Sequence, residues 1–287
     1  MTSWLVTGGS GMLGKDLLAR LALDGENATG FGRRELDITD ATAVAAALDR
    51  GQPSVVVNCA AWTAVDDAEE HEDAALEVNG HAAAGLAAAC AERGIALVQV
   101  STDYVFDGQA RHPYPEGHAP APGTAYGRTK LAGEQAVLGQ LDGSAYIVRT
   151  AWLYGARGPN FVRTMIGLER KADTLTVVDD QRGQPTWALD VAGQIVALVR
   201  SGAAGGTYHA TSSGDTTWFG LAREVFRLLG ADPDRIKPVP SSDYPRPAPR
   251  PAYSVLGHDR WPTVGLAPIG DWRDALRRAF PALRQSV

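Results

Sequence analysis

The stretch Ser3-Trp-Leu-Val-Thr-Gly-Gly-Ser-Gly-Met-Leu-Gly14 decides the fold of this chain. It begins as a short apolar run, passes through a glycine-rich turn, and leads into helically spaced apolar residues from Lys15 to Ala22. A dinucleotide-binding fingerprint requires this order of strand, turn and helix. Gly8 permits the turn, Gly11 lets backbone N–H groups approach a pyrophosphate, and Gly14 lets helix and strand pack closely. The positive end of the helix dipole favours the same anion.

Further β-α units follow this stretch. Strands are predicted at 28–32, 54–58, 96–101 and 146–150, with 54–58 and 96–101 buried, and helices are predicted at 41–50, 72–93 and 126–138. Three such units in the first hundred residues favour a doubly wound parallel sheet. We therefore predict an α/β fold: a Rossmann-like doubly wound parallel sheet with a smaller, discontinuous C-terminal substrate-binding region. The predicted regions are 1–151 for NAD(P) binding, with 175–205 packing back onto it, and 152–174 and 206–287 mainly for substrate binding.

Composition excludes several classes of protein. The chain has 287 residues, of which 45% are hydrophobic and 21% charged, and its formal net charge is −6. That sign argues against a nucleic-acid partner, which needs a basic surface. No stretch approaches the ~20 apolar residues of a membrane span, so no membrane partner is expected. The N-terminus has no signal-peptide pattern. Cys59 and Cys90 lack metal-binding spacing and suit a reducing compartment, so we predict a cytoplasmic protein.

Tyr126 and Lys130 open a predicted helix and lie four residues apart, on one helix face. An ammonium group near a phenol lowers its pKa from the ordinary value of about 10, so the phenol could exchange a proton with a reacting oxygen. Thr102 follows the predicted strand 96–101, at the edge where open α/β sheets bind ligands. Alone, such a pair is more often a packed ring and a solvated amine. The glycine turn and Thr102 favour the catalytic interpretation.

Arg33 and Arg34 stand at the end of the second predicted strand, where an acidic residue would bind the ribose 2′-hydroxyl of NAD. Guanidinium groups suit a 2′-phosphate, so we predict NADPH as cofactor, with NADH possible as a second choice. A solvated turn is the alternative interpretation of this pair. Asp37 and Ile38 are expected near the adenine.

Several longer motifs carry a resemblance to a known family. They are Glu35-Leu-Asp-Ile-Thr39, Val57-Asn-Cys-Ala-Ala-Trp-Thr-Ala-Val-Asp66, Ser101-Thr-Asp-Tyr-Val-Phe-Asp-Gly108, Tyr126-Gly-Arg-Thr-Lys-Leu-Ala-Gly-Glu134, Arg149-Thr-Ala-Trp-Leu-Tyr-Gly155, Asp180-Gln-Arg-Gly-Gln-Pro-Thr186 and Arg250-Pro-x-Tyr-Ser254. With the glycine turn, the chain resembles the extended short-chain dehydrogenases/reductases and, more narrowly, the dTDP-4-dehydrorhamnose reductases. These motifs span the whole chain, and the Ser-Thr-Asp-Tyr-Val-Phe string is far more specific than the glycine turn.

The resemblance implies NAD(P)H-dependent reduction of dTDP-4-dehydro-β-L-rhamnose at C4, which gives dTDP-L-rhamnose. Tyr126 would donate the proton to the sugar O4, Lys130 would lower its pKa and hold the nicotinamide ribose, and Thr102 would bind the reacting oxygen. The expected cofactor-binding residues are Gly8, Ser10, Gly11, Met12, Leu13, Arg33, Asp37, Ile38, Ala60, Ala61, Thr63, Tyr126 and Lys130. The expected substrate-binding residues are Thr102, Asp103, Tyr104, Trp152, Asn160 and Arg250.

Other functions of the same fold stay open. Epimerases and dehydratases are alternatives, although dehydratases place Asp-Glu after the catalytic threonine and this chain has Asp103-Tyr104. A non-catalytic NADP-binding regulatory subunit is a third alternative, against which the three predicted catalytic residues argue. Some relatives dimerise through a magnesium ion held by glutamates. The matching positions here hold Asp16 and Leu189, so no metal is predicted, and the chain is expected to be a monomer or homodimer.

Overall fold

The computed structural model describes residues 2–141 and 143–286. Its centre is a six-stranded sheet in the order β10-β5-β4-β3-β1-β2, and every neighbouring pair in it is parallel. The strands are β1 (Ser3–Thr7), β2 (Asn27–Phe31), β3 (Val55–Asn58), β4 (Ala96–Thr102), β5 (Ala145–Thr150) and β10 (Gly206–His209). The strand order reverses between β1 and β3, and ligands bind outside such a switch point in open α/β sheets.

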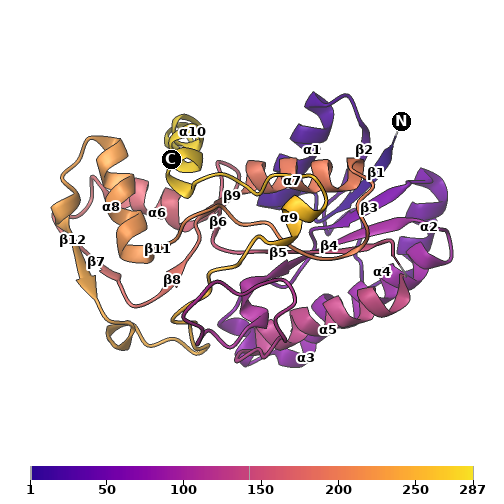
Figure 1. Ribbon diagram of the computed structural model, residues 1–287, viewed down its shortest axis with the longest axis horizontal. Helices are drawn as coiled ribbons and strands as arrows, with labels where there is room; N and C mark the ends of the chain where they lie inside the picture. Colours follow the sequence, from indigo (N-terminus) through magenta and orange to yellow (C-terminus); the bar gives the residue numbers. More distant parts are fainter. Residues whose placement is uncertain (1, 142, 287) are drawn as a thin grey trace.

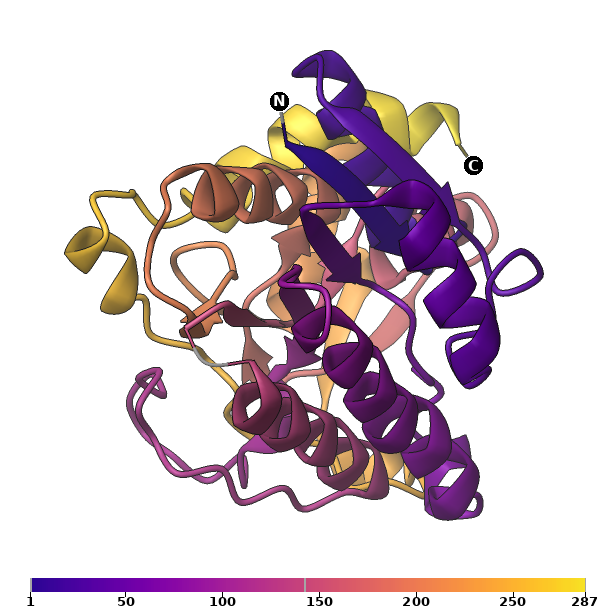
Figure 2. The same ribbon diagram turned by 90° about the vertical axis from the view of Figure 1, so that its right-hand side faces the viewer.

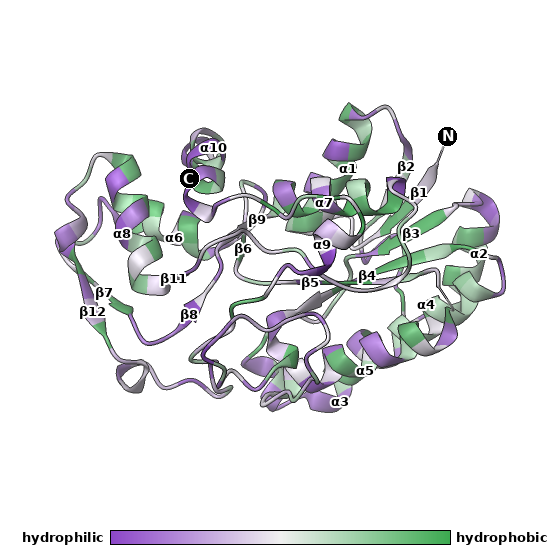
Figure 3. Cartoon of the chain, viewed as in Figure 1, coloured by the Kyte–Doolittle hydropathy of each residue, from purple (hydrophilic) through white to green (hydrophobic). Residues whose placement is uncertain are grey.

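Helices cover both faces of this sheet (Figure 2), which confirms the predicted doubly wound fold. They are α1 (Met12–Leu23), α2 (Ala41–Gly51), α3 (Glu72–Leu76), α4 (Ala82–Ala91), α5 (Ala125–Gln140) and α7 (Ala188–Arg200). Successive strand residues point to opposite faces. Accordingly Trp4 and Val6 pack with α1 and α7, whereas Leu5 between them packs with α2 and α4. Buried strands are apolar on both faces, and in Figure 3 the central strands are correspondingly green.

The predicted continuous helix 72–93 is interrupted. Between α3 and α4 the chain forms a π-helical turn, Glu77–His81, which widens the helix by one residue. The buried side chain of Asn79 lies in this turn and forms hydrogen bonds with both backbone groups of Trp62, at 2.9 and 3.1 Å. Its amide also donates to the Thr129 hydroxyl on α5, at 3.1 Å. The turn therefore fixes the loop after β3 against α5.

The rest of the chain forms a smaller region beyond the carboxyl ends of the strands, at the left in Figure 1. Its helices are α6 (Phe161–Leu168), α8 (Trp218–Leu229) and α10 (Trp272–Gln285), with α9 (Arg260–Thr263) nearer the main sheet. Its strands pair two by two: β6 (Leu153–Tyr154) with β9 (Thr186–Trp187), β7 (Leu175–Val178) with β12 (Ile236–Val239), and β8 (Arg182–Gly183) with β11 (Thr216–Thr217). The three helices share an apolar core with β7 and β12.

The chain crosses between the two regions more than once. β10 pairs with β5, so the predicted substrate region 206–287 begins with a strand of the main sheet. The α7 helix packs against α1 in the core on one sheet face. Trp187 precedes α7 and provides no side-chain cap, and the nearby Thr186 hydroxyl donates to the Gln184 carbonyl instead of capping the helix.

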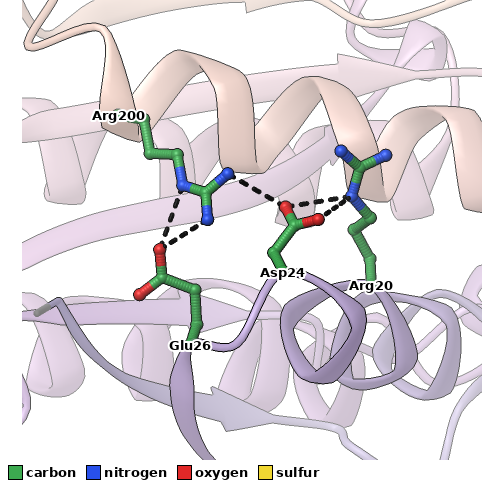
Figure 4. Close-up of polar contacts among 4 residues, drawn as sticks. All are labelled: Arg20, Asp24, Glu26 and Arg200. Atoms are coloured by element: carbon green, nitrogen blue, oxygen red, sulfur yellow. Dashed lines mark hydrogen bonds and ion pairs between the residues drawn. The ribbon is translucent and has the colours of Figure 1, made fainter.

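An ion-pair cluster fastens the end of α7 to the turn between α1 and β2 (Figure 4). Arg200 donates to Asp24 at 3.0 Å and to Glu26 at 2.7 Å, and Arg20 contacts the same Asp24 carboxylate at 3.1 Å. These side chains join segments that are far apart in the sequence.

Candidate active site

A cavity of about 1150 Å³ lies between the carboxyl ends of the strands and the smaller region. Every side chain or glycine predicted for the site lines it except Asn160. The Asn160 side chain accepts from the Arg163 N–H at 3.1 Å and donates to the Gly155 carbonyl at 2.7 Å. It therefore caps α6 and closes the preceding loop, and the structure does not place it against the substrate space as predicted.

The glycine turn after β1 forms one end of the cavity. Gly8 has a φ of +65°, and a Cβ there would lie 2.6 Å from the Ala60 nitrogen. A Cβ on Gly14 would lie 2.3 Å from the Gly8 carbonyl oxygen, so side chains are excluded at both positions. Gly11 precedes α1 and offers no side chain to its first N–H groups. These free donors and the helix dipole suit a phosphate anion.

Tyr126 and Lys130 both lie buried on the cavity wall, in the first turns of α5. The Thr124 hydroxyl accepts from the Gly127 N–H at 3.0 Å and so caps the helix just before Tyr126. A Cβ on Gly127 would lie 2.1 Å from the Tyr104 carbonyl oxygen, so only glycine lets α5 approach the end of β4 this closely. The Lys130 Nζ donates to the Val100 carbonyl at 2.7 Å, which fixes the ammonium group beside β4.

Burial dominates the charge states of this pair. It raises the pKa of Tyr126 to about 12, although a hydrogen bond with Thr102 opposes the rise. Burial also lowers the pKa of Lys130 to about 8, against the attraction of Glu134. In this structure burial, and not Lys130, sets the direction of the phenol's pKa shift. Desolvation outweighs the neighbouring charge, and the ammonium group is held by a backbone carbonyl.

Thr102 and Asp103 connect the end of β4 to the phenol. The Thr102 hydroxyl donates to the Asp103 carboxylate at 3.0 Å and accepts from the Tyr104 N–H at 3.2 Å. The second Asp103 oxygen is buried and has no hydrogen-bond partner among the described residues. Burial raises the pKa of Asp103 to about 6, although the hydrogen bond from Thr102 opposes the rise. The Tyr104 ring packs edge-on against Tyr126. Thr102, Asp103 and the two tyrosines therefore form one cluster of polar side chains on this wall of the cavity.

The two arginines after β2 differ in position. Arg33 lines the cavity, with its side chain 80% exposed and its Nε 3.6 Å from the Asp37 carboxylate. Arg34 is exposed and does not line the cavity. Asp37 is itself held by the Thr39 backbone N–H and hydroxyl, at 3.0 and 2.8 Å. Only Arg33 is therefore placed to contact an anion bound at this end.

Arg250 belongs to a proline-rich strap, residues 244–251, that borders the cavity. Its guanidinium donates to the Asp66 carboxylate at 2.8 Å and to the Ala248 carbonyl at 2.9 Å. The Ala248 N–H donates to the other Asp66 oxygen at 3.3 Å. The residue predicted as an anion ligand thus already has a carboxylate partner. Arg246, on the same strap, lines the cavity as a second cation.

The smaller region adds an apolar wall that the sequence analysis missed. It consists of Phe161, Met165, Val177, Trp218 and Tyr244. Trp152, which was predicted, stacks on Trp218 with ring centroids 3.6 Å apart and an 8° angle between the planes. No local motif marks these residues, because they come from separate short elements. The proline-rich composition around Tyr244 was the one available signal.

Two further observations on the described residues concern a membrane span and a metal site. No helix among them is both long and apolar enough to cross a membrane. Nor do they bring together three or more His, Cys, Asp or Glu side chains in a way that could hold a metal ion. The Asp16 carboxylate lies 3.4 Å from the Arg157 guanidinium.

A parallel sheet with a glycine turn at its switch point, and a buried Tyr-Lys pair facing the same cavity, defines a dinucleotide-binding protein of the Rossmann type. More narrowly, the chain belongs to the family described as RmlD substrate binding domain, whose family model matches residues 2–285. The family resemblance drawn from the motifs is thereby confirmed.

Curated relatives of similar length support this membership. A dTDP-4-keto-6-deoxy-D-glucose reductase of Streptomyces niveus is 56% identical over 280 residues, which cover 98% of this chain and 97% of that protein. A dTDP-4-dehydrorhamnose reductase of Streptomyces griseus is 55% identical, over 98% of this chain and 93% of that protein. Among solved structures, the dTDP-4-dehydrorhamnose reductase of Bacillus anthracis in complex with NADP has a TM-score of 0.94 and 36% identity, covering 98% of this chain and 99% of that chain.

Proposed function

We propose that this protein is an NADPH-dependent reductase of dTDP-4-keto-6-deoxyhexoses, and that it reduces dTDP-4-dehydro-β-L-rhamnose at C4. One observation carries the proposal: the Tyr126 phenol, Thr102 and the glycine turn after β1 all line one cavity. A nicotinamide cofactor and a sugar nucleotide could therefore meet beside a proton donor. Relatives more than half identical over nearly the whole chain are named as reductases of such sugar nucleotides.

The residues present fit a dinucleotide. The tight turn and its packing require glycine at positions 8 and 14, and the uncapped start of α1 offers N–H groups to a phosphate. Arg33 would contact a 2′-phosphate, which favours NADPH over NADH. When bound, the reduced nicotinamide supplies the hydride. The Bacillus anthracis relative was solved with NADP.

The chain's own part in the reaction is proton transfer. As the sugar carbonyl gains a hydride at C4, its oxygen becomes basic and takes the proton of the Tyr126 hydroxyl. The product is an alcohol, and a phenolate is left on the enzyme. A nearby positive charge would stabilise the phenolate that remains. Lys130, buried on the same wall, would provide it.

The test is NADPH oxidation with the keto sugar. Purified protein is given dTDP-4-keto-6-deoxy-D-glucose, with and without a 3,5-epimerase that converts it to dTDP-4-dehydro-β-L-rhamnose. We expect stoichiometric NADPH consumption that depends on the epimerase. Consumption without the epimerase would instead make the unepimerised sugar the substrate. Product formation without net NADPH oxidation would indicate an epimerase or dehydratase, and no turnover of either sugar would reject the proposal.

The wider setting follows from the same proposal. Cys59 and Cys90 are both free thiols, which suits the reducing cytoplasm. The predicted site residues line one cavity of a single chain, so the site is compatible with a monomer and with a homodimer.

A further inference from the structure

Trp152 adopts an unusual backbone conformation at the border of the cavity. Its φ is +45°, one of only two positive values among the described non-glycine residues. Side chains with a Cβ are disfavoured in this left-handed region. The strained turn leads the chain from β5 into β6, and the Trp152 carbonyl accepts from the Thr186 N–H of β9 at 3.2 Å. Strain of this kind persists only where the surroundings fix it.

The surroundings that fix the Trp152 indole come from two other segments. A Cβ on Gly183 would lie 2.5 Å from the indole Cε2, so the ring packs directly on the β8 backbone. Trp218 stacks on the same indole, with centroids 3.6 Å apart. The two contacts are tied together, because Gly183 pairs with Thr216 in β11, two residues before Trp218. Figure 1 shows β8, β11 and the start of α8 side by side.

Trp218 is itself held in place from its own side. It is the first residue of α8, directly after Thr217, whose hydroxyl caps the helix by accepting from the Gly220 N–H at 3.1 Å. The Phe161 ring, at the start of α6, leans on Trp218 with centroids 4.7 Å apart. Trp152, Trp218 and Phe161 all line the cavity. The starts of two helices thus support one aromatic wall.

We propose that Trp218 is a positioning residue for the sugar nucleotide: its stacked indole, together with the close backbone of Gly183, holds Trp152 in its left-handed turn so that Trp152 faces the sugar. The inference rests on the proposed function for the identity of the ligand. Trp218 acts through Trp152 and makes no contribution to the cofactor end. Aromatic stacking adds binding energy beyond burial, so loss of the stack should be measurable.

The test is a double-mutant cycle on binding of the product dTDP-L-rhamnose, measured by calorimetry in the presence of NADP⁺. We expect Trp218→Ala to weaken binding about tenfold and Trp218→Phe, which keeps a stacking ring, much less. NADPH affinity should change by less than about twofold, since the ring contacts of Trp218 are with Trp152 and Phe161 and not with the glycine turn. In a Trp152→Ala background, Trp218→Ala should add almost nothing, because the two act as one unit.

Gly183→Ala provides a separate route to the same result, since it leaves Trp218 intact and only displaces the Trp152 indole. It should weaken product binding in wild-type protein but not in Trp152→Ala protein. The inference would be overturned if the loss of product affinity in a double variant equalled the product of the losses in the two single variants. An unchanged product affinity in Trp218→Ala would overturn it as well. A wild-type protein that binds dTDP-L-rhamnose without reducing either keto sugar would reject the proposed function and leave the cycle readable. If Trp218→Ala does not fold, the Trp218→Phe and Gly183→Ala cycles decide.

Discussion

Asp103, Tyr126 and Lys130 lie near the carboxyl end of β4. Burial shifts the pKa of each side chain in the direction that favours its uncharged form. The pKa rises to about 6 for Asp103 and to about 12 for Tyr126, and it falls to about 8 for Lys130. A lone buried charge is costly. In the proposed reaction, therefore, a neighbouring charge or hydrogen bond has to stabilise whichever of these groups becomes charged.

Asp103 should make stability depend on pH in an unusual direction. Because its pKa rises from 3.8 to about 6, the folded protein binds more protons than the unfolded chain between these values. Its contribution to the free energy of unfolding therefore falls as pH rises through this window. Urea unfolding of wild type and Asp103→Asn should give a stability difference that moves against wild type from pH 4 to about 6. A difference moving the other way would mean that the carboxylate is stabilised by folding.

Arg33 and Arg34 offer a matched pair for the cofactor, since only Arg33 lines the cavity. Arg33→Ala should raise the KM for NADPH by about tenfold and leave the KM for NADH nearly unchanged, because only NADPH carries the 2′-phosphate. Arg34→Ala is the control and should change neither. Steady-state kinetics with both cofactors decide. Equal small changes in all four measurements would mean that the pair is a solvated turn.

The α5 helix connects the site to the core on the scale of secondary structure. Close to Lys130 it presents Glu134, which forms a buried bidentate pair with Arg149 of β5 at 2.9 and 2.6 Å. The same helix forms an exposed bidentate pair between Arg128 and Glu72 of α3, at 2.7 Å for both bonds. Because both ion pairs are bidentate but differ in burial, their contributions to the stability of the fold can be compared.

Replacing the glutamate of each pair should lower the free energy of unfolding by very different amounts. Glu134→Ala leaves the buried Arg149 guanidinium without its carboxylate and should destabilise the fold by about 3–5 kcal/mol. Glu72→Ala breaks a solvent-exposed pair and should cost about 0–1 kcal/mol. Chemical denaturation of both variants measures the difference. Similar small losses would mean that water reaches Arg149 as easily as it reaches Arg128.

Some elements could be predicted from the sequence and others could not. The strands of the sheet and the cap of α2 by Asp40 follow from apolar runs and local capping, and the structure has them. The π turn at Asn79 could not be predicted, because it depends on hydrogen bonds to Trp62 and Thr129, far away in the chain. Asn160 does not line the cavity as predicted, because its amide bonds to backbone groups close to it in the chain and to the Met12 sulfur. The stack on Trp218 arises only in the folded chain.

On the scale of the whole molecule, ion pairs join distant segments, and two of these connections can be compared. The pair of Asp66 with Arg250 joins the loop after β3 to the proline-rich strap beside the cavity. The cluster of Glu26, Asp24 and Arg200 joins α7 to the turn after α1 (Figure 4). The first borders the proposed substrate space, and none of the residues of the second lines the cavity. They form a matched pair for separating substrate binding from general stability.

Asp66→Asn should loosen the strap and leave Arg250 without its carboxylate partner. We expect a several-fold higher KM for the sugar nucleotide, an unchanged KM for NADPH, and faster amide exchange within residues 244–251. Glu26→Gln, which weakens the other connection, should leave both KM values unchanged. Kinetics and hydrogen exchange on the two variants test this. A lower KM in Asp66→Asn would instead mean that the pair restrains Arg250 from binding the substrate's diphosphate.

The central claim is that Tyr126 delivers the proton to the reduced sugar, and Tyr126→Phe tests it most directly. The substitution removes only the hydroxyl, so ring packing against Tyr104 and cofactor binding should persist. The measurement is kcat for reduction of the 4-keto sugar nucleotide, with folding and NADPH affinity checked on the same sample. General acid catalysis is worth about 10²–10⁴-fold, and we predict a loss of kcat in that range. A folded Tyr126→Phe protein with near wild-type kcat would contradict the account.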